Sequence, residues 1–247
     1  MIIEKEKTIG QIVADDYRTA AIFKSFGIDF CCKGNRTISE VCNQKNISAE
    51  TLREALEKTI AQERYGSPNF VNWALDLLVD YIEKKHHRYV REKIPELNAY
   101  LEKLCKVHGK THPELFEIKE LFKASANELF SHMHKEERIL FPAIRAMSEA
   151  EMNGRLNIQR PPFGTVGNPI NMMMLEHETE GERFRRIAAL TDGYSPPADA
   201  CTTYRVTFAL LEEFEEDLHQ HIHLENNILF PKAILLEKEL SNMENSN

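Results

Sequence analysis

The sequence predicts an all-α protein, an antiparallel four-helix bundle with a small helical domain at its N-terminus. The stretch HMHKEERILFP at 132–142 returns as HIHLENNILFP at 221–231. His87 and His177 precede the first residue of these two copies by 45 and 44 residues, so the spacing of a whole helix pair is duplicated. Apolar residues recur at every third or fourth position through these segments, which is the period of an α-helix that buries one face.

Residues 1–62 are expected to form the small helical domain. Apolar side chains follow helical spacing from Ile9 to Phe26. Gly27 then favours a helix end, because glycine accepts the left-handed conformation common just past a helix. Thr37 and Glu40 have the spacing of a capping box at the start of a further helix. A domain of this size gains little stability from its own core, so we expect it to dock or dimerise.

The bundle is expected to cover residues 69–238, after a linker at 63–68 and before a tail at 239–247. Short breaks near 109–112 and 191–197 imply that consecutive helices run antiparallel. A longer loop joins the two duplicated helix pairs. Four long helices with ligands on their inner faces are typical of bundles that hold a cofactor in their core.

Composition excludes several classes of function. The 247 residues include 31 basic and 39 acidic side chains, a formal net charge of −8, so no nucleic-acid footprint is expected. No stretch approaches the roughly 20 apolar residues that span a membrane, and the charged first ten residues are unlike a secretion signal. Five cysteines, an odd number, do not describe a disulfide framework. We therefore expect a cytoplasmic protein with reduced thiols.

The duplicated motifs predict a metal centre. Residues four apart on a helix share one face, so each copy aims an imidazole and a carboxylate at one point. Imidazole with carboxylate suits first-row transition metals better than calcium or magnesium, and six ligands are too many for one tetrahedral zinc ion. Two iron ions that share two bridging carboxylates, with an oxo or hydroxo bridge and open positions for a diatomic gas, account for the whole set. The predicted ligands are His87, His132, Glu136, His177, His221 and Glu225.

An alternative is that these residues have no common role. A single histidine on an apolar helix face is usually structural, and one His-Glu pair four residues apart is worth only about 0.2–0.5 kcal/mol as a surface contact. The matched spacing of the two copies argues against this alternative. The other histidines lack that support and are expected to face solvent; they are His86, His108, His112, His134, His219 and His223.

Three acids are candidates for a supporting role around the metal ions. Glu128 and Asp217 each lie four residues before a motif histidine, and Glu176 is next to His177. A carboxylate in such a place can orient an imidazole or guide an ion, although an ordinary helix-surface acid has the same spacing.

Cys31 and Cys32 stand side by side in a turn rich in glycine and asparagine. Buried structural cysteines are one interpretation, and a disulfide between neighbours would be strained. The polar turn favours the other interpretation, an accessible and redox-active pair.

The predicted ligand set, together with the segment YRTAAIFKSFGIDFCCKG, resembles the RIC family (repair of iron centres) of the ScdA and YtfE type, whose bundle is a hemerythrin-like di-iron domain. The resemblance covers nearly the whole chain. It implies a non-haem di-iron centre with the four histidines as terminal ligands and the two glutamates as bridges. His87 is preferred to the adjacent His86 because it stands eight residues before Pro95, as the family pattern requires.

The resemblance also implies a function. It indicates a homodimer that restores iron-sulfur clusters damaged by nitric oxide or oxidants, by donating iron to the damaged iron-sulfur proteins. Two other hypotheses stay open from the residues themselves. One is a di-iron nitric oxide reductase, an enzyme in which Cys31 and Cys32 relay electrons. The other is a carrier or sensor of oxygen or nitric oxide. A carrier would not need the cysteine-bearing domain, which argues against that hypothesis. Between the other two, we expect an iron-donating repair protein rather than a turnover enzyme, with nitric oxide reduction as the alternative.

Overall fold

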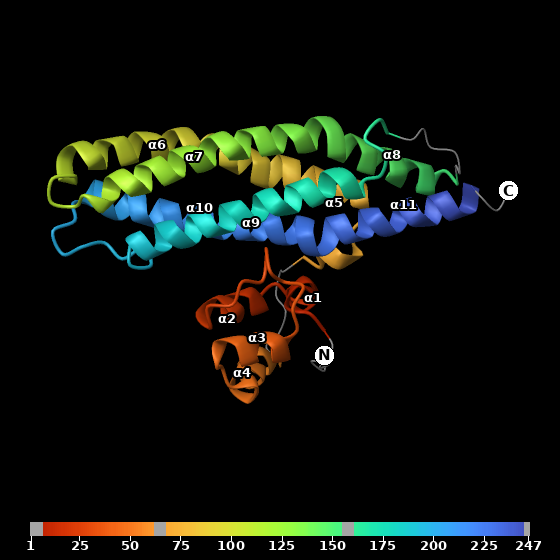
Figure 1. Cartoon of the computed structure of the whole chain (residues 1–247), viewed down its shortest axis with the longest axis horizontal. Coiled ribbons are helices and arrows are strands. Elements are labelled where there is room, and N and C mark those ends of the chain that lie inside the picture. The colour runs from red at the N-terminus through yellow and green to blue at the C-terminus, as the bar shows by residue number, and fades with distance from the viewer. Residues whose placement is uncertain (1–6, 62–67, 155–160, 245–247) are drawn as a thin grey trace.

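The computed structural model describes residues 7–61, 68–154 and 161–244. Its regular elements in these ranges are helices, and the only β-type pairing there is an isolated bridge between Thr8 and Thr37. Figure 1 shows a long bundle of helices with the small N-terminal domain against one side. The predicted all-α fold is confirmed. None of the helices in these ranges is long and apolar enough to cross a membrane.

The small domain consists of four short helices. They are α1 (Ile9–Asp15), α2 (Thr19–Ser25), α3 (Ile38–Lys45) and α4 (Ala49–Ala61). The predicted capping box starts α3: the Glu40 N–H donates to Thr37 Oγ1 at 3.3 Å, and the Thr37 N–H donates to Glu40 Oε2 at 2.7 Å. Gly27 follows α2 with φ +64°, the left-handed conformation predicted for it.

The bundle consists of four long helices, three of them interrupted by a π-helical segment. The first contains α5 (Leu75–Tyr81), η2 (Ile82–His87) and α6 (Arg88–His108); the second contains α7 (Glu114–Lys135), η3 (Glu136–Leu140) and α8 (Phe141–Met152). The third is α9 (Gly167–Leu190), and the fourth contains α10 (Thr202–Leu224), η4 (Glu225–Leu229) and α11 (Phe230–Glu244). Packing of α6 on α7, α7 on α9, α9 on α10 and α10 on α6 closes the bundle. The tail that we predict after residue 238 is therefore helical up to Glu244, and Leu240 in it is buried in the core.

A polar layer divides the apolar core of the bundle. One core cluster combines the inner faces of α6, α7, α9 and α10 with the core of the small domain. The other lies among α5, α8 and α11 at the opposite end. Between them, buried histidines and glutamates interrupt the apolar packing. Buried charges need partners or metal ions, so the fold itself marks this layer as a site.

The π-helical segments lie at this polar layer. His87 is the last residue of η2, while Glu136 and Glu225 are the first residues of η3 and η4. A π turn contains one residue more than an α turn, and such turns occur frequently at functional sites. The sequence period predicts plain α-helix here, so these segments are a feature that periodicity does not reveal.

The small domain is held to the bundle through two neighbouring asparagines of η4. Asn226 Nδ2 donates to the Cys31 carbonyl at 3.1 Å, and Asn227 Nδ2 donates to the Phe30 carbonyl at 3.3 Å. Gly10 of α1 lies so close to Asn227 that a Cβ atom there would stand 2.0 Å from its side-chain oxygen. Glycine is therefore required at this position for α1 to approach the bundle.

Candidate metal centre

The structure brings all six predicted ligands together in the polar layer. They come from all four long helices: His87 from η2, His132 from α7, Glu136 from η3, His177 from α9, His221 from α10 and Glu225 from η4. Each side chain is buried, with exposed fractions between 0% and 3%. Six titratable groups without water around them need strong mutual interactions or metal ions to remain there.

The six side chains form two overlapping groups of four. One group is His87, Glu136, His221 and Glu225; the other is His132, Glu136, His177 and Glu225. Within each group the ligand atoms lie within 4.8 Å of one another. Each group takes one histidine from each half of the duplication, and both carboxylates belong to both groups. A carboxylate shared in this way stands where a bridging ligand between two metal ions would stand.

The distances at the shared carboxylates are those of ligands facing a common point. Glu136 Oε2 lies 3.3 Å from Nε2 of His87 and 3.3 Å from Nε2 of His132. Glu225 Oε2 lies 3.2 Å from Nε2 of His177, and its Oε1 lies 3.0 Å from Nε2 of His221.

Several of these buried atoms have no hydrogen-bond partner among the described residues. They include both carboxylate oxygens of Glu136, Oε2 of Glu225 and Nε2 of His87. A buried polar atom without a partner costs about 1–3 kcal/mol, and more when it is charged. Lone pairs that converge in a buried space fit metal ions. The donor set therefore fits a pair of transition-metal ions.

In the absence of a metal, protons on the histidines balance the charge of the buried carboxylates. Burial is the largest influence on His132 and lowers its pKa, but the carboxylates of Glu136 and Glu176 outweigh burial and raise the pKa to about 10. His87 behaves in the same way, with a pKa raised to about 9 by Glu136 and Glu137 against burial. Burial acts to raise the pKa of Glu225, yet the neighbouring histidines hold it well below its usual value. Protons on the imidazoles thus balance the carboxylates, and metal ions would displace them.

Three side chains hold the far nitrogen of a ligand ring. His132 Nδ1 lies 2.8 Å from Glu176 Oε2, and His87 Nδ1 lies 2.8 Å from Glu137 Oε1. His177 Nδ1 lies 2.9 Å from Asn226 Oδ1. An acceptor at Nδ1 keeps the proton there and leaves Nε2 free to bind a metal.

Two of these orienting residues are absent from the sequence-based candidates. Glu137 and Asn226 each come directly after the motif glutamate that belongs to both groups of candidate ligands. They therefore occupy equivalent positions in the two copies, and each contacts the Nδ1 atom of a candidate ligand histidine. Aligning the two copies of the motif, and not only their histidines and glutamates, is the signal that would have found them.

Comparison with known proteins agrees with this geometry. The model of the hemerythrin HHE cation-binding domain matches residues 78–233, and that of ScdA_N, a domain of unknown function, matches residues 5–60. The chain is 32% identical over 231 residues to the iron-sulfur cluster repair protein ScdA of Staphylococcus haemolyticus, covering 94% of this chain and 99% of the relative. It is 34% identical over 233 residues to the iron-sulfur cluster repair protein YtfE of Musicola paradisiaca, covering 93% of this chain and 97% of the relative.

The chain belongs to the ScdA/YtfE family. Its match runs over both parts of these relatives, the small domain and the bundle.

One ligand ring of this ScdA/YtfE-family protein lacks a hydrogen-bonded partner. His221 Nδ1 is buried and has no hydrogen-bond partner among the described residues. His86 stacks on the His221 ring instead, with ring centres 5.5 Å apart and planes 10° from parallel. Asp217, a candidate to orient His221, lies against His86, with Oδ2 3.0 Å from Nδ1. The two groups of candidate ligands in the ScdA/YtfE-family chain are therefore unequal in their surroundings.

The expectation that the other six histidines face solvent is wrong for most of them. His134 is exposed, as expected. His86 and His223 are 0% and 1% exposed, because one packs on a ligand ring and the other lies under the small domain. The remaining three, His108, His112 and His219, are partly buried. Helical spacing alone does not reveal that a second domain covers a face of the bundle.

The cysteine turn of this ScdA/YtfE-family protein lies directly against helix α9, which carries the candidate ligand His177. The Cys32 thiol donates to the carbonyl oxygen of His177 at 3.2 Å. The two sulfur atoms of Cys31 and Cys32 are 3.6 Å apart and both thiols are free. The hydrogen bond with Cys32, followed by burial, raises the pKa of Cys31 well above its ordinary value. Cys31 is thus a protonated thiol rather than a thiolate nucleophile when no metal is bound.

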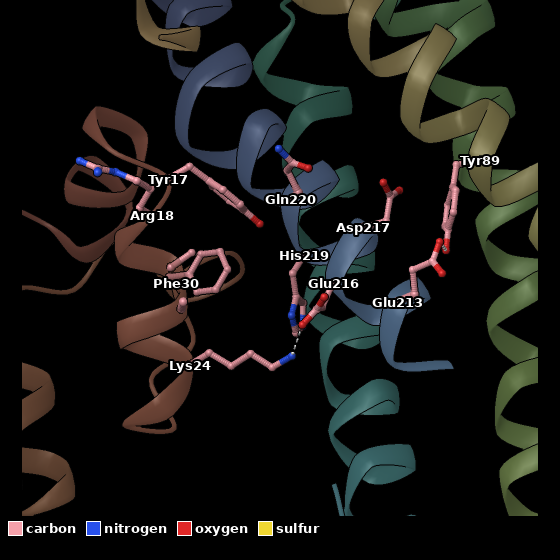
Figure 2. A pocket seen from close by; sticks show the side chains of 12 residues that line it. Tyr17, Arg18, Lys24, Phe30, Tyr89, Glu213, Glu216, Asp217, His219 and Gln220 are labelled. Carbon is pink, nitrogen blue, oxygen red and sulfur yellow. Dashed lines mark hydrogen bonds and ion pairs between the residues drawn. The ribbon is translucent and has the colours of Figure 1, made fainter. Parts of the chain in front are cut away.

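Two openings lie near the candidate ligands, and only the smaller one is lined by any of them. One, of about 190 Å³, is lined by Glu128, Leu129, Ser131, His132, Lys135, Glu176, His177 and Glu180. The other, of about 460 Å³, lies between the small domain and α10, and Figure 2 shows Tyr17, Lys24 and Phe30 facing Glu216 and Asp217 across it. The first opening reaches two proposed ligands directly. The second reaches only Asp217, the partner of His86.

Proposed function

We propose that this protein holds a di-iron centre and repairs iron-sulfur clusters damaged by nitrosative or oxidative stress by donating iron. The proposed ligands are the six buried side chains predicted from the sequence, with Glu136 and Glu225 as bridges. Two relatives that match the chain over nearly its whole length carry the name of iron-sulfur cluster repair proteins, which supports the proposal.

The observation that carries the proposal is the acidic opening beside one of the two metal positions. His132 and His177 line it from within, and Glu128, which is 56% exposed, stands at its rim. Glu176 lies between, pairing with both His132 and Lys135. Hydrogen bonds with His132 and Lys135 dominate over its partial burial and lower the pKa of Glu176 to about 2, so the carboxylate stays ionised. Three carboxylates, those of Glu128, Glu176 and Glu180, line the opening against the single lysine Lys135, and Arg183 pairs with Glu128 and Glu180. This excess of acids along the lining suits the passage of a cation, which a permanently closed centre would not need.

The chain's own residues prepare the centre for iron. When bound, the two iron ions would supply Lewis acidity and one-electron redox chemistry. Glu137, Asn226 and Glu176 keep the Nδ1 protons of three ligand rings in place, so each Nε2 presents a lone pair. Burial of the layer excludes water from the carboxylates. The imidazole protons held without metal leave as iron enters, so loading releases protons.

Iron transfer to a damaged cluster tests the proposal. Iron-loaded protein, prepared without air, should restore the activity of a nitric-oxide-damaged [4Fe-4S] enzyme faster than an equal amount of free ferrous iron. The His132→Ala/Glu136→Ala variant should give no more recovery than free iron. Equal recovery with that variant would overturn the proposal.

A second pair of variants tests the passage itself. Glu128→Gln should slow transfer of iron to a chelator outside the protein while leaving the iron content unchanged. Glu117→Gln is the matched control, because Glu117 lies on the same helix and pairs with Arg186 away from the opening. Equal transfer rates for the two variants would contradict a passage at Glu128.

Reduction of nitric oxide is a second candidate, favoured by the position of the thiol pair beside the His177 backbone. Two nitric oxide molecules, two electrons and two protons give nitrous oxide and water, and the dithiol of Cys31 and Cys32 could supply both electrons and protons on forming a disulfide. Sustained production of nitrous oxide with a thiol reductant, lost in a Cys31→Ala/Cys32→Ala variant, would support it. A single burst per protein would not. A stable, reversible oxygen adduct would favour a carrier or sensor over both.

The proposal places the protein in the cytoplasm as a homodimer. The free state of all five cysteines fits a reducing compartment. Sedimentation of the iron-loaded protein would report the oligomeric state.

A further inference from the structure

The turn that carries Cys31 and Cys32 gathers a second kind of donor set, outside the bundle core. Its ligand atoms, two sulfur atoms and a carboxylate oxygen of Asp29, lie within 4.8 Å of one another. Cys31 Sγ is 3.6 Å from Cys32 Sγ and 3.5 Å from Asp29 Oδ1. The bundle ligands are nitrogen and oxygen atoms only, so this group has a different metal preference.

The two spacings that involve Cys31 Sγ fit both thiol hydrogen bonds and two edges of a tetrahedral metal site, and the third edge, from Cys32 Sγ to the Asp29 carboxylate, lies within 4.8 Å. With metal–sulfur bonds of about 2.3 Å and metal–oxygen bonds of about 2.1 Å, the sulfur–sulfur edge of a tetrahedron is about 3.8 Å and the sulfur–oxygen edge about 3.6 Å. A disulfide would instead require about 2.05 Å between the sulfur atoms. We propose that Asp29, Cys31 and Cys32 bind one divalent thiophilic metal ion, such as ferrous iron or zinc, as a third metal position of this protein.

The turn is already arranged for this role. Asp29 Oδ1 accepts the backbone N–H groups of Cys31 at 3.2 Å and Cys32 at 3.0 Å, which fixes both residues beside the carboxylate. Asp29 Oδ2 pairs with Arg185 at 2.9 Å. Two thiolates and one carboxylate carry three negative charges, and a divalent ion with the Arg185 guanidinium balances them. Uptake breaks two S–H bonds, forms two metal–sulfur bonds and releases two protons to solvent, with no electron transferred.

The site lies between the bundle and the surface. Cys32 Sγ contacts the backbone carbonyl of the proposed ligand His177 at 3.2 Å. This approach depends on Gly181 one helical turn further along α9, where a Cβ atom would stand 3.0 Å from Cys32 Sγ. Cys32 itself is only partly buried, so a donor from outside can reach this side of the turn. A cysteine thiolate of a damaged iron-sulfur protein is such a donor. Use of the site as a relay rests on the proposed iron donation, whereas metal binding itself does not.

Anaerobic titration of the full-length protein with cobalt(II) tests the site. We expect thiolate-to-cobalt charge-transfer absorption in the near ultraviolet whose full development requires one equivalent of cobalt per chain beyond the content of the bundle. The Cys31→Ser and Cys32→Ser variants should each lose most of this absorption, and Asp29→Asn should weaken binding at least tenfold. Cys201→Ser, which removes an exposed cysteine elsewhere, should leave it unchanged. Ferrous iron should compete with cobalt for the same absorption.

A second measurement uses the parent protein alone and does not depend on whether a variant folds. One equivalent of cobalt beyond the bundle's own content should slow alkylation of Cys32 at least tenfold while Cys201 reacts at its former rate. The proposal is overturned if no thiolate absorption develops at saturating cobalt, if it persists in the double serine variant, or if cobalt leaves the alkylation of Cys32 unchanged. Because the thiolate-to-cobalt absorption requires metal bound to sulfur, it tests this site independently of whether the bundle donates iron.

Discussion

Asn226 joins the small domain to the proposed metal centre, and its replacement gives the sharpest test of the site. Its side-chain oxygen lies 2.9 Å from His177 Nδ1, and its side-chain nitrogen donates to the Cys31 carbonyl at 3.1 Å. Asn226→Ala removes both contacts. Loss of a side chain that orients a metal ligand typically costs 10- to 100-fold in metal affinity, which is about 1.4–2.7 kcal/mol. We expect a loss of that size for the ion held by His132 and His177.

Two further variants separate the two contacts. Asn226→Asp keeps an acceptor for His177, as Glu137 does for His87, but it loses the donor to Cys31. Its metal affinity should match or exceed that of the parent, while the small domain docks less firmly. Asn227→Ala is the matched control, because Asn227 contacts the carbonyls of Phe30 at 3.3 Å and Cys31 at 3.5 Å but none of the six candidate ligands in the bundle.

The assay is competition with a coloured chelator under anaerobic conditions, and limited proteolysis reports docking. A dissociation constant for metal in Asn226→Ala within threefold of the parent value would contradict this prediction. So would an equal loss of metal affinity in Asn226→Ala and Asn227→Ala.

Three other outcomes are expected. Burial under Tyr17 and Phe30 lowers the pKa of His223 from 6.5 to about 3. Between these two pH values the unfolded chain binds a proton that the folded protein does not. The contribution of neutral His223 to the free energy of unfolding is therefore complete above pH 6.5 and declines as pH falls from 6.5 towards 3, by up to about 1.4 kcal/mol per pH unit. The difference in urea midpoint between parent and His223→Gln should shrink from pH 7.5 to 5.0, and a constant difference would contradict this. Gly181→Ala should stabilise helix α9 by up to about 1 kcal/mol, but its added methyl group should displace the Cys32 side chain. The Cys32 thiol should therefore be alkylated faster than in the parent. An unchanged alkylation rate would contradict the close packing of Cys32 against Gly181. Removal of metal by a chelator should lower the free energy of unfolding by about 2.7 kcal/mol per site at a free metal concentration 100 times the dissociation constant, and equal urea midpoints with and without metal would argue against binding in the buried layer.

The six candidate ligands could be found from the sequence because the duplication repeats both residue types and spacing. Helical periodicity places His132 and Glu136 on one face, and the structure brings that face into the core. The all-α fold follows from the same periodicity. The capping residues Thr37 and Glu40 could also be found, because a cap is local chemistry between residues three apart.

What periodicity could not reveal depends on contacts between distant segments. His223 has the spacing of a solvent-facing residue on the bundle, and only the docked small domain buries it against Tyr17 and Phe30. Asp217 lies one helical turn before His221, yet its carboxylate contacts His86 of the neighbouring helix instead. The contact between Cys32 and His177 joins residues 145 positions apart. Such pairings belong to tertiary structure, and a single sequence carries no signal for them.

The π-helical segments have a consequence for how this chain can change over generations. Each contains an added residue relative to an α-helix, with Glu136 and Glu225 at the first place of their segments. Deleting one residue inside such a segment would restore a regular α-helix and keep the helices on either side of it nearly in phase, because a π turn of five residues and an α turn of four cover almost the same angle. The change would then fall on the segment itself, where Glu136 and Glu225 begin η3 and η4. Codon deletions there should therefore disturb the candidate metal centre more than the apolar core on either side.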